Sequence, residues 1–141
     1  MRLLAAKPKD AAHGKGEQNM SQDSTTGNDA KTGDGLPIEG LDDLAVTHDH
    51  LLGKTVSVMQ PKSGFRVGTD AVLLAAAIGV NRGRILDMGA GVGGVSLCLA
   101  RRLDAVQITA IEIDPVMAAL AQRNVVANGF DDRLRILHDD I

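Results

Sequence analysis

The chain has 141 residues, of which 44% are hydrophobic, and a formal net charge of −3. This length predicts one domain at most, and the hydrophobic content is compatible with a packed core. The composition shows no basic patch of the kind that binds nucleic acid, no transmembrane segment and no export signal, so we expect a cytoplasmic protein without a membrane partner.

A polar segment opens the chain. From Lys7 to about Gly40 the residues are mainly Lys, Asp, Gly, Ser, Thr, Asn and Gln. Such a segment cannot bury enough apolar surface to offset the entropy lost on ordering. We therefore predict a disordered tail over residues 1–46. An interaction arm is the alternative, although its mixed charge indicates no type of partner.

Order is expected from about Thr47. Residues 55–60 alternate between apolar and polar side chains, residues 61–64 have turn chemistry, and residues 65–67 resume an extended pattern. This arrangement predicts a small β-hairpin. A buried helix is expected to follow over residues 71–78, capped by Thr69 or Asp70.

Strands and helices then alternate. We predict strands over 84–88, 106–111 and 134–138, with helices over 95–103 and 115–128. Asp114 is expected to cap the second of these helices because Pro115 suits the first helical position. Alternation with short connections predicts an α/β fold with a right-handed parallel sheet.

A glycine-rich loop follows the first of these strands. Gly89, Gly91 and Gly94 fit a nucleotide-binding fingerprint, but Asp87 precedes the first glycine. A carboxylate there would repel the pyrophosphate of a dinucleotide and attract the ammonium and sulfonium charges of S-adenosylmethionine. The pattern therefore favours the methyl donor. A dinucleotide and a ligand-free tight turn are the two alternatives.

Acids also follow the other two strands, where ligands of parallel sheets bind. Glu112 lies 21 positions beyond Gly91, a spacing that places a carboxylate where it can accept both ribose hydroxyls. Ile113 is expected either to cover an adenine face or to lie in the core. Asp139 and Asp140 are candidates for the adenine amine, or form a solvated acid pair.

Other reactive residues form no recognisable site. His48, His50 and His138 stand at no metal-ligand spacing, so no metal is expected. Cys98, the single cysteine, is interpreted as a small buried hydrophobe in a reducing compartment. Two arginine pairs, 101–102 and 133–135, are interpreted as solvated faces rather than phosphate contacts.

Four segments carry a resemblance to a known family. They are residues 60–75, 85–94, 111–115 and 138–141. Together they resemble the bacterial N6-adenine tRNA methyltransferases that act beside the anticodon of valine tRNA, which are class I methyltransferases dependent on S-adenosylmethionine. The glycine loop is shared by most of that class, whereas the segment from Val67 to Ala75 is more restrictive.

The resemblance implies a seven-stranded Rossmann-like sheet, truncated here after the third strand, with residues 47–141 as the cofactor-binding half of the domain. It implies that Asp87, Gly89 and Gly91 hold the methionine end of the donor, that Glu112 takes the ribose and that Asp140 meets the adenine amine. Thr69 and Asp70 would lie near the methionine part. The expected cofactor-binding set is Asp87, Gly89, Ala90, Gly91, Glu112, Ile113 and Asp140.

The family's catalytic Asn-Pro-Pro-Tyr or Asn-Pro-Pro-Phe loop follows its fourth strand and does not occur in this sequence. The resemblance assigns tRNA as partner of the complete enzyme. This chain is expected not to transfer methyl groups, to bind the donor weakly or not at all, and to leave residues 84–88 as an open apolar edge. A protein or small-molecule methyltransferase, a dinucleotide-binding oxidoreductase module and a non-catalytic binding fragment are the alternatives.

Overall fold

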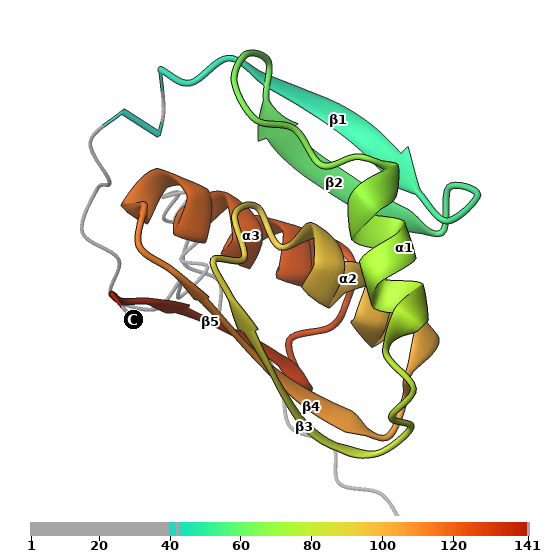
Figure 1. Cartoon of the computed structure of the whole chain (residues 1–141). Helices are drawn as coiled ribbons and strands as arrows, with labels where there is room; N and C mark the ends of the chain where they lie inside the picture. Colours follow the sequence, from blue (N-terminus) through green and yellow to red (C-terminus); the bar gives the residue numbers. More distant parts are fainter. Residues whose placement is uncertain (1–39, 42, 141) are drawn as a thin grey trace, which may run out of the picture. The chain divides into compact units, whose positions relative to one another are not determined.

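The computed structural model describes residues 40, 41 and 43–140 (Figure 1). Residues 1–39, most of the predicted tail, lie outside the described residues. The elements in chain order are β1 (Val46–Leu51), β2 (Val56–Pro61), α1 (Thr69–Ala77), β3 (Gly83–Met88), α2 (Gly94–Arg102), β4 (Val106–Glu112), α3 (Pro115–Ala127) and β5 (Leu134–His138).

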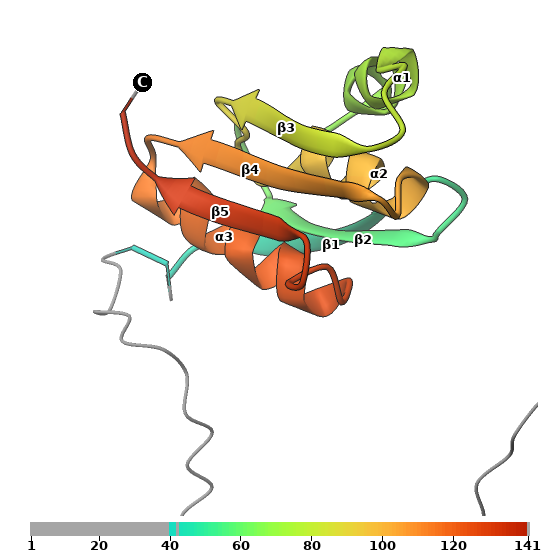
Figure 2. The same ribbon diagram turned by 90° about the horizontal axis from the view of Figure 1, so that it is seen from below.

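Strands β3, β4 and β5 form a parallel sheet in that order. Ile108 of β4 is in register with Ile85 on one side and Leu134 on the other. The connections between the strands carry α2 and α3, as the alternating pattern predicted. Because the strands are parallel, their carboxyl ends meet at one edge, where all three arrows point in Figure 2.

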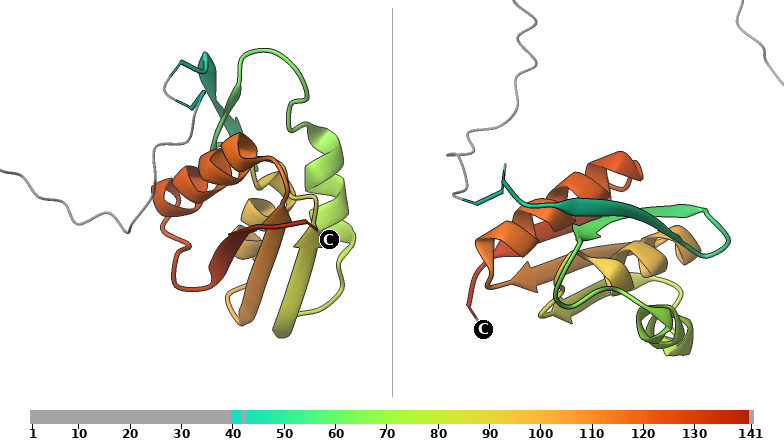
Figure 3. Two further views of the ribbon diagram at one scale, coloured as in Figure 1. Left: turned by 90° about the vertical axis from the view of Figure 1, so that its left-hand side faces the viewer. Right: turned by 90° about the horizontal axis from the view of Figure 1, so that it is seen from above.

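Helices α2 and α3 lie on one face of the sheet, and the β1–β2 hairpin packs against these helices on the side away from it (Figures 1 and 3). The core fills the space between these layers with aliphatic side chains. Its fully buried members include Val56, Val58, Leu97, Leu99, Ile108, Leu120 and Val125. Helix α1 packs against α2.

Two asparagines on α3 attach the hairpin by imitating a β-strand. Asn124 accepts from the Met59 N–H at 2.7 Å and donates to the Met59 carbonyl at 2.8 Å. One helical turn later, Asn128 pairs with both backbone groups of Ser57 in the same way. The open edge of β2 is therefore satisfied by side-chain amides, which present the same donor and acceptor as a backbone peptide.

The predicted hairpin was wrong in its pairing. Strand β2 pairs with β1, which precedes it, in an antiparallel ladder that runs from Val46 opposite Pro61 to Leu51 opposite Val56. Residues 65–67 form a loop rather than a strand. The sequence misled because β1, with its two histidines and Asp49, is too polar to show a strand pattern.

Helix α1 also differs from its prediction. Gly68 is the N-cap residue, and no side chain caps this end by a hydrogen bond. Only Ala71 and Ala75 are buried, whereas Leu73 and Leu74 are more than half exposed. The continuous run of apolar residues predicts a helix that is buried on all sides. In the structure, α1 contacts the rest of the described chain along one face.

The arginines predicted as solvated faces are partly bound to helix ends. Arg102 donates to the carbonyls of Ala75 and Ile78 at the carboxyl end of α1, and Arg133 donates to the Ala100 carbonyl near the end of α2 at 3.0 Å. These carbonyls have no partner within their own helices, and cationic side chains suit that end of a helix.

Candidate cofactor-binding site

The glycine loop folds back onto the neighbouring strand. Gly89 and Gly91 have φ angles of 74° and 56°, a region that glycine enters without a steric penalty. The N–H groups of Gly89 and Ala90 both donate to the Ile111 carbonyl at 2.9 Å. A Cβ built on Gly89 or Gly91 would meet no atom within 4 Å, so open space lies beside the backbone there.

Glu112 is the last residue of β4, and its side chain holds the glycine loop in place. One oxygen of its carboxylate accepts from the Gly91 N–H at 2.7 Å, and the other accepts from the Asp114 N–H at 2.9 Å. The residue is 8% exposed. Each carboxylate oxygen has capacity for a further hydrogen bond, so the side chain that holds the loop can also accept from a ligand.

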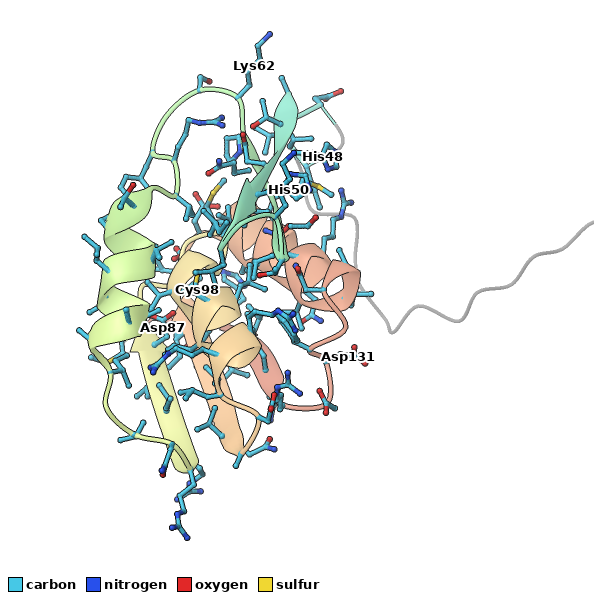
Figure 4. All side chains as sticks on the ribbon, turned by 90° about the vertical axis from the view of Figure 1, so that its right-hand side faces the viewer. His48, His50, Lys62, Asp87, Cys98 and Asp131 are labelled. Carbon is cyan, nitrogen blue, oxygen red and sulfur yellow. The ribbon has the colours of Figure 1, made fainter. Side chains whose placement is uncertain are left out.

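Asp87 lies on β3 and bonds to α2, and it is not part of the wall of the cavity over the glycine loop. Its Oδ2 accepts from the Ser96 hydroxyl at 2.6 Å, in the first turns of that helix. Figure 4 shows Asp87 close to α1 and α2. The residue is half-buried and anchors the start of α2 beneath the glycine loop.

A cavity of about 330 Å³ opens over the loop, which is within the size range of small-molecule sites. Glu112 lies on its wall together with three of the predicted loop residues, Gly89, Ala90 and Gly91. Apolar side chains and one further acid complete it. These are Phe65, Val67, Asp70, Ala71, Val92 and Val95, with Gly94.

Ile113, Asp139 and Asp140 lie beyond this cavity, at the carboxyl ends of β4 and β5. Ile113 is 59% exposed, so the interpretation of this residue as core is wrong. Its carbonyl lies 3.0 Å from Nε2 of His138. The Asp139 N–H donates to the Glu112 carbonyl at 3.1 Å, which ties the acid pair to the end of β4.

The loop before α1 is the part of the site that sequence reasoning missed. Phe65 and Val67 line the cavity, although their sequence pattern predicts a strand. Asp70 also lines it, whereas Thr69 does not, and their placement near the methionine part of the donor stays a prediction. The sequence contained one signal for this part of the site, namely Phe65. It is one of two phenylalanines in a chain without tryptophan or tyrosine, and it follows Gly64 in a predicted turn.

A polar network holds this loop to the hairpin. Arg66 donates to Asp49 at 2.7 Å, to the Thr47 hydroxyl at 3.0 Å and to the Pro61 carbonyl at 2.8 Å. Hydrogen bonds from Gln60 and Thr47, with the Arg66 guanidinium, hold the pKa of Asp49 below its usual value. The hydrogen bonds of Arg66 therefore fix the backbone of the loop next to Phe65.

Metal-ligating clusters and membrane-spanning helices are both absent from residues 40, 41 and 43–140. No group of three or more histidine, cysteine, aspartate or glutamate side chains is placed to hold a metal ion in this part of the chain. None of its helices is long and apolar enough to cross a membrane.

Three similar proteins carry the name tRNA1(Val) (adenine(37)-N6)-methyltransferase. The one from Flavobacteriaceae bacterium strain 3519-10 is 44% identical over 88 residues, which are 62% of this chain and 38% of the relative. Those from Flavobacterium psychrophilum and Vibrio campbellii are 45% and 35% identical and cover 60% and 62% of this chain. The match spans 37% of each of these two relatives.

The structure is similar to that of P. horikoshii TYW2 in complex with MeSAdo, with a TM-score of 0.58 and 23% sequence identity. The match covers 67% of this chain and 36% of that one, and it supports the Rossmann-like α/β fold. The family model for the methyltransferase small domain matches residues 62–141, more than half of the chain. This protein therefore belongs to the methyltransferase small domain family.

Proposed function

We propose that this chain is the S-adenosylmethionine-binding half of a methyltransferase, and that the complete enzyme methylates an adenine N6 of tRNA. The chain spans little more than a third of the length of the relatives it matches. The assignment of a tRNA adenine as methyl acceptor is therefore based on the names of those relatives. The donor site rests on the geometry of Glu112 and the glycine loop.

One observation carries the donor assignment, namely the hydrogen bond between Glu112 and the Gly91 N–H. A pyrophosphate binds to loop amides that are free to donate to it. Here the Glu112 carboxylate accepts from Gly91, and the Gly89 and Ala90 amides donate to Ile111. This arrangement supports a phosphate-free, cationic adenosine derivative over a dinucleotide.

The residues at the site fit such a donor. Glu112 would accept the ribose hydroxyls, the open space at Gly89 and Gly91 would admit the ligand against the backbone, and Asp70 is a second acid on the wall of the cavity. Ile113 and Asp140 stay the proposed adenine contacts, and Asp87 a residue of the methionine end. When bound, the sulfonium supplies an electrophilic methyl group.

The chain's own part in the reaction is to bind and orient. Glu112 and the loop fix the donor, so that the methyl group can face an acceptor amine in line with the bond to sulfur. In the complete enzyme the bound donor would supply its methyl group to that amine: the nitrogen–carbon bond would form as the carbon–sulfur bond breaks, the sulfur would keep that electron pair as the thioether of S-adenosylhomocysteine, and the nitrogen would lose a proton to solvent. No residue of this half is proposed as a catalytic acid or base.

Substitution of Glu112 tests the donor site. We expect Glu112→Gln to weaken S-adenosylhomocysteine binding about tenfold, because an amide offers one acceptor oxygen where the carboxylate offers two. Asp104→Asn is the matched control, since Asp104 lies before β4 at the opposite end of the sheet with a 95% exposed side chain. The affinities are measured by NMR titration, which detects millimolar binding.

Equal affinity of Glu112→Gln and the unmodified chain would contradict the assignment, and so would an equal loss in Asp104→Asn. Methyl transfer is checked separately with valine tRNA and labelled donor. We expect no turnover by this chain alone, and turnover would contradict the proposal that it is one half of the enzyme.

A further inference from the structure

We infer that Phe65 is a ligand-contacting residue that covers the donor where it crosses the glycine loop. This inference rests on the proposed donor site and adds to it a residue from outside the sheet. It also explains why an aromatic side chain stands exposed in a chain that has no tryptophan or tyrosine.

The position of the ring supports the inference. Phe65 is 82% exposed, whereas the other phenylalanine, Phe130, is 5% exposed. Phe65 lines the cavity over the glycine loop and also a neighbouring cavity of about 300 Å³. Gly91 and Val92 belong to both walls as well. The Phe65 ring therefore lies beside the glycine loop, between the two cavities.

The loop that carries the ring is held on both sides. Arg66 is bonded to the hairpin through Asp49, Thr47 and Pro61. On the other side the Val67 N–H donates to the Gln60 side chain at 2.8 Å, and the Val67 side chain lies directly against Gly94. Because these bonds already fix the loop, its backbone needs little further ordering when the ring meets a ligand.

The chemistry of the cavity indicates which part of the donor the ring meets. Glu112 and Asp70 are the acids on its wall, and Phe65 and Val67 are apolar members of the same wall. We place the ribose of the donor at Glu112 and its amino group near Asp70. The sulfur atom and the attached carbons of the donor then lie between these two acids, next to Phe65. An aromatic face suits both the apolar carbons and a positive sulfonium.

A single-tryptophan variant tests contact directly. Because the chain has no tryptophan or tyrosine, Phe65→Trp would report from this position alone. We expect its emission to shift or be quenched as S-adenosylhomocysteine is added. Leu73→Trp is the control, since Leu73 on α1 is 64% exposed and does not line the cavity. Its emission should not change.

Truncation of the side chain tests the contribution to affinity. We expect Phe65→Ala to weaken S-adenosylhomocysteine binding about tenfold, within the range for removal of one aromatic stacking partner. The urea unfolding midpoint should not change, because the ring is exposed in the free chain. Lys62→Ala is the same-loop control, and Lys62 points away from the helices in Figure 4.

NMR of the backbone amides separates the two proposals. Ligand-induced shifts at residues 89–91 without an emission change in Phe65→Trp, or with full affinity in Phe65→Ala, would overturn the role of Phe65 and leave the donor site intact. No shift at any residue, up to the solubility limit of S-adenosylhomocysteine, would overturn both the role of Phe65 and the proposal that this half binds the donor by itself. Shifts at residues 89–91, with an emission change in Phe65→Trp and weakened binding in Phe65→Ala, would support both.

Discussion

Gly94 is the residue at which the loop before α1 meets the start of α2. A Cβ built on it would lie 2.6 Å from Cγ1 of Val67 and 2.7 Å from Cγ2, closer than carbon atoms can approach. The Val67 side chain is attached to a loop held by Arg66 and Gln60. The pair therefore has little room to adjust, and the glycine is required by packing.

We expect Gly94→Ala to lower the free energy of unfolding by about 2 kcal/mol, as insertion of a methyl group into a filled space does. Gly79→Ala is the matched control, because a Cβ there meets no atom within 4 Å. Urea unfolding measures both. A destabilisation of the same size in the two variants would contradict the role assigned to the contact with Val67, because Gly79→Ala introduces no such contact.

Cys98 is the one cysteine and is 1% exposed on the inner face of α2. Burial raises the pKa of its thiol, so the reactive thiolate is scarce in the folded chain. We expect a thiol reagent to modify Cys98 only as the chain unfolds, at a rate that rises with urea. Rapid modification of the folded protein at neutral pH would contradict the buried position.

The candidate site shows what residue types can and cannot predict. The helix cap at Asp114 followed from its position before a proline that opens a helix, and Glu112 ends a strand as expected, whereas its role as a ribose ligand stays a prediction. The hydrogen bonds from Gly91 to Glu112 and from Ser96 to Asp87 did not follow. They depend on how the loop turns back over β4, which spacing alone does not determine.

Among the elements, α3 makes the connection between the hairpin and the sheet. Asn124 is 1% exposed and bonds to both backbone groups of Met59 and to the Val92 carbonyl at 3.0 Å. It therefore joins β2 to the segment that follows the glycine loop. Asn128 bonds to Ser57 in a more exposed position.

We predict that Asn124→Ala lowers the free energy of unfolding by about 3 kcal/mol, because one buried and two part-buried hydrogen bonds lose their partner at once. Asn128→Ala should cost about 1 kcal/mol, since water can replace the amide there. Gln122→Ala, on the exposed side of α3, serves as control. Equal losses in the two asparagine variants would contradict the difference in burial.

The hairpin also predicts a dependence of stability on pH. The pKa of Asp49 is lower in the folded chain because Gln60, Thr47 and Arg66 stabilise its charged form. This stabilisation is present above the usual carboxyl pKa of 3.8 and is lost as the pH falls through the lower folded value. Thermal unfolding below pH 4 should show a smaller loss in Asp49→Asn than in the unmodified chain. An identical acid profile would contradict this.

Elements with a clear period were predicted well, and those without one were not. Strand β5 and the start of α3 were predicted at the observed residues, and β3, β4 and α2 within one residue. Strand β1 was missed because its alternation consists of polar side chains that bond to the loop before α1. Burial of α1 was overestimated because its apolar residues do not reveal which of them meet α2.

At the scale of the whole described chain, the face of the sheet opposite α2 and α3 carries apolar side chains. Leu86 and Met88 on β3 are 57% and 60% exposed, beside the backbone of an edge strand. Parallel sheets are ordinarily covered on both faces. Within the described residues, no helix covers Leu86 and Met88, which agrees with the apolar edge expected from the sequence.

We expect this face to cause self-association of the 141-residue chain. Sedimentation should show concentration-dependent oligomers that Leu86→Lys and Met88→Lys together reduce, because charge on an edge strand prevents pairing. Leu73→Lys and Leu74→Lys on α1 are the controls, since both leucines are also more than half exposed. A monomer at all concentrations would contradict the expectation.

Selection of the ligand by charge at the glycine loop is the central claim, and an NMR titration of this chain with S-adenosylmethionine and, separately, with NAD tests it most directly, because only the first carries a sulfonium charge and only the second a pyrophosphate. We predict that S-adenosylmethionine shifts the amide signals of residues 89–91 and of Glu112, and that NAD at the same concentration leaves them in place. If NAD shifts these signals and S-adenosylmethionine does not, the loop accepts a pyrophosphate beside Glu112 and the claim is wrong.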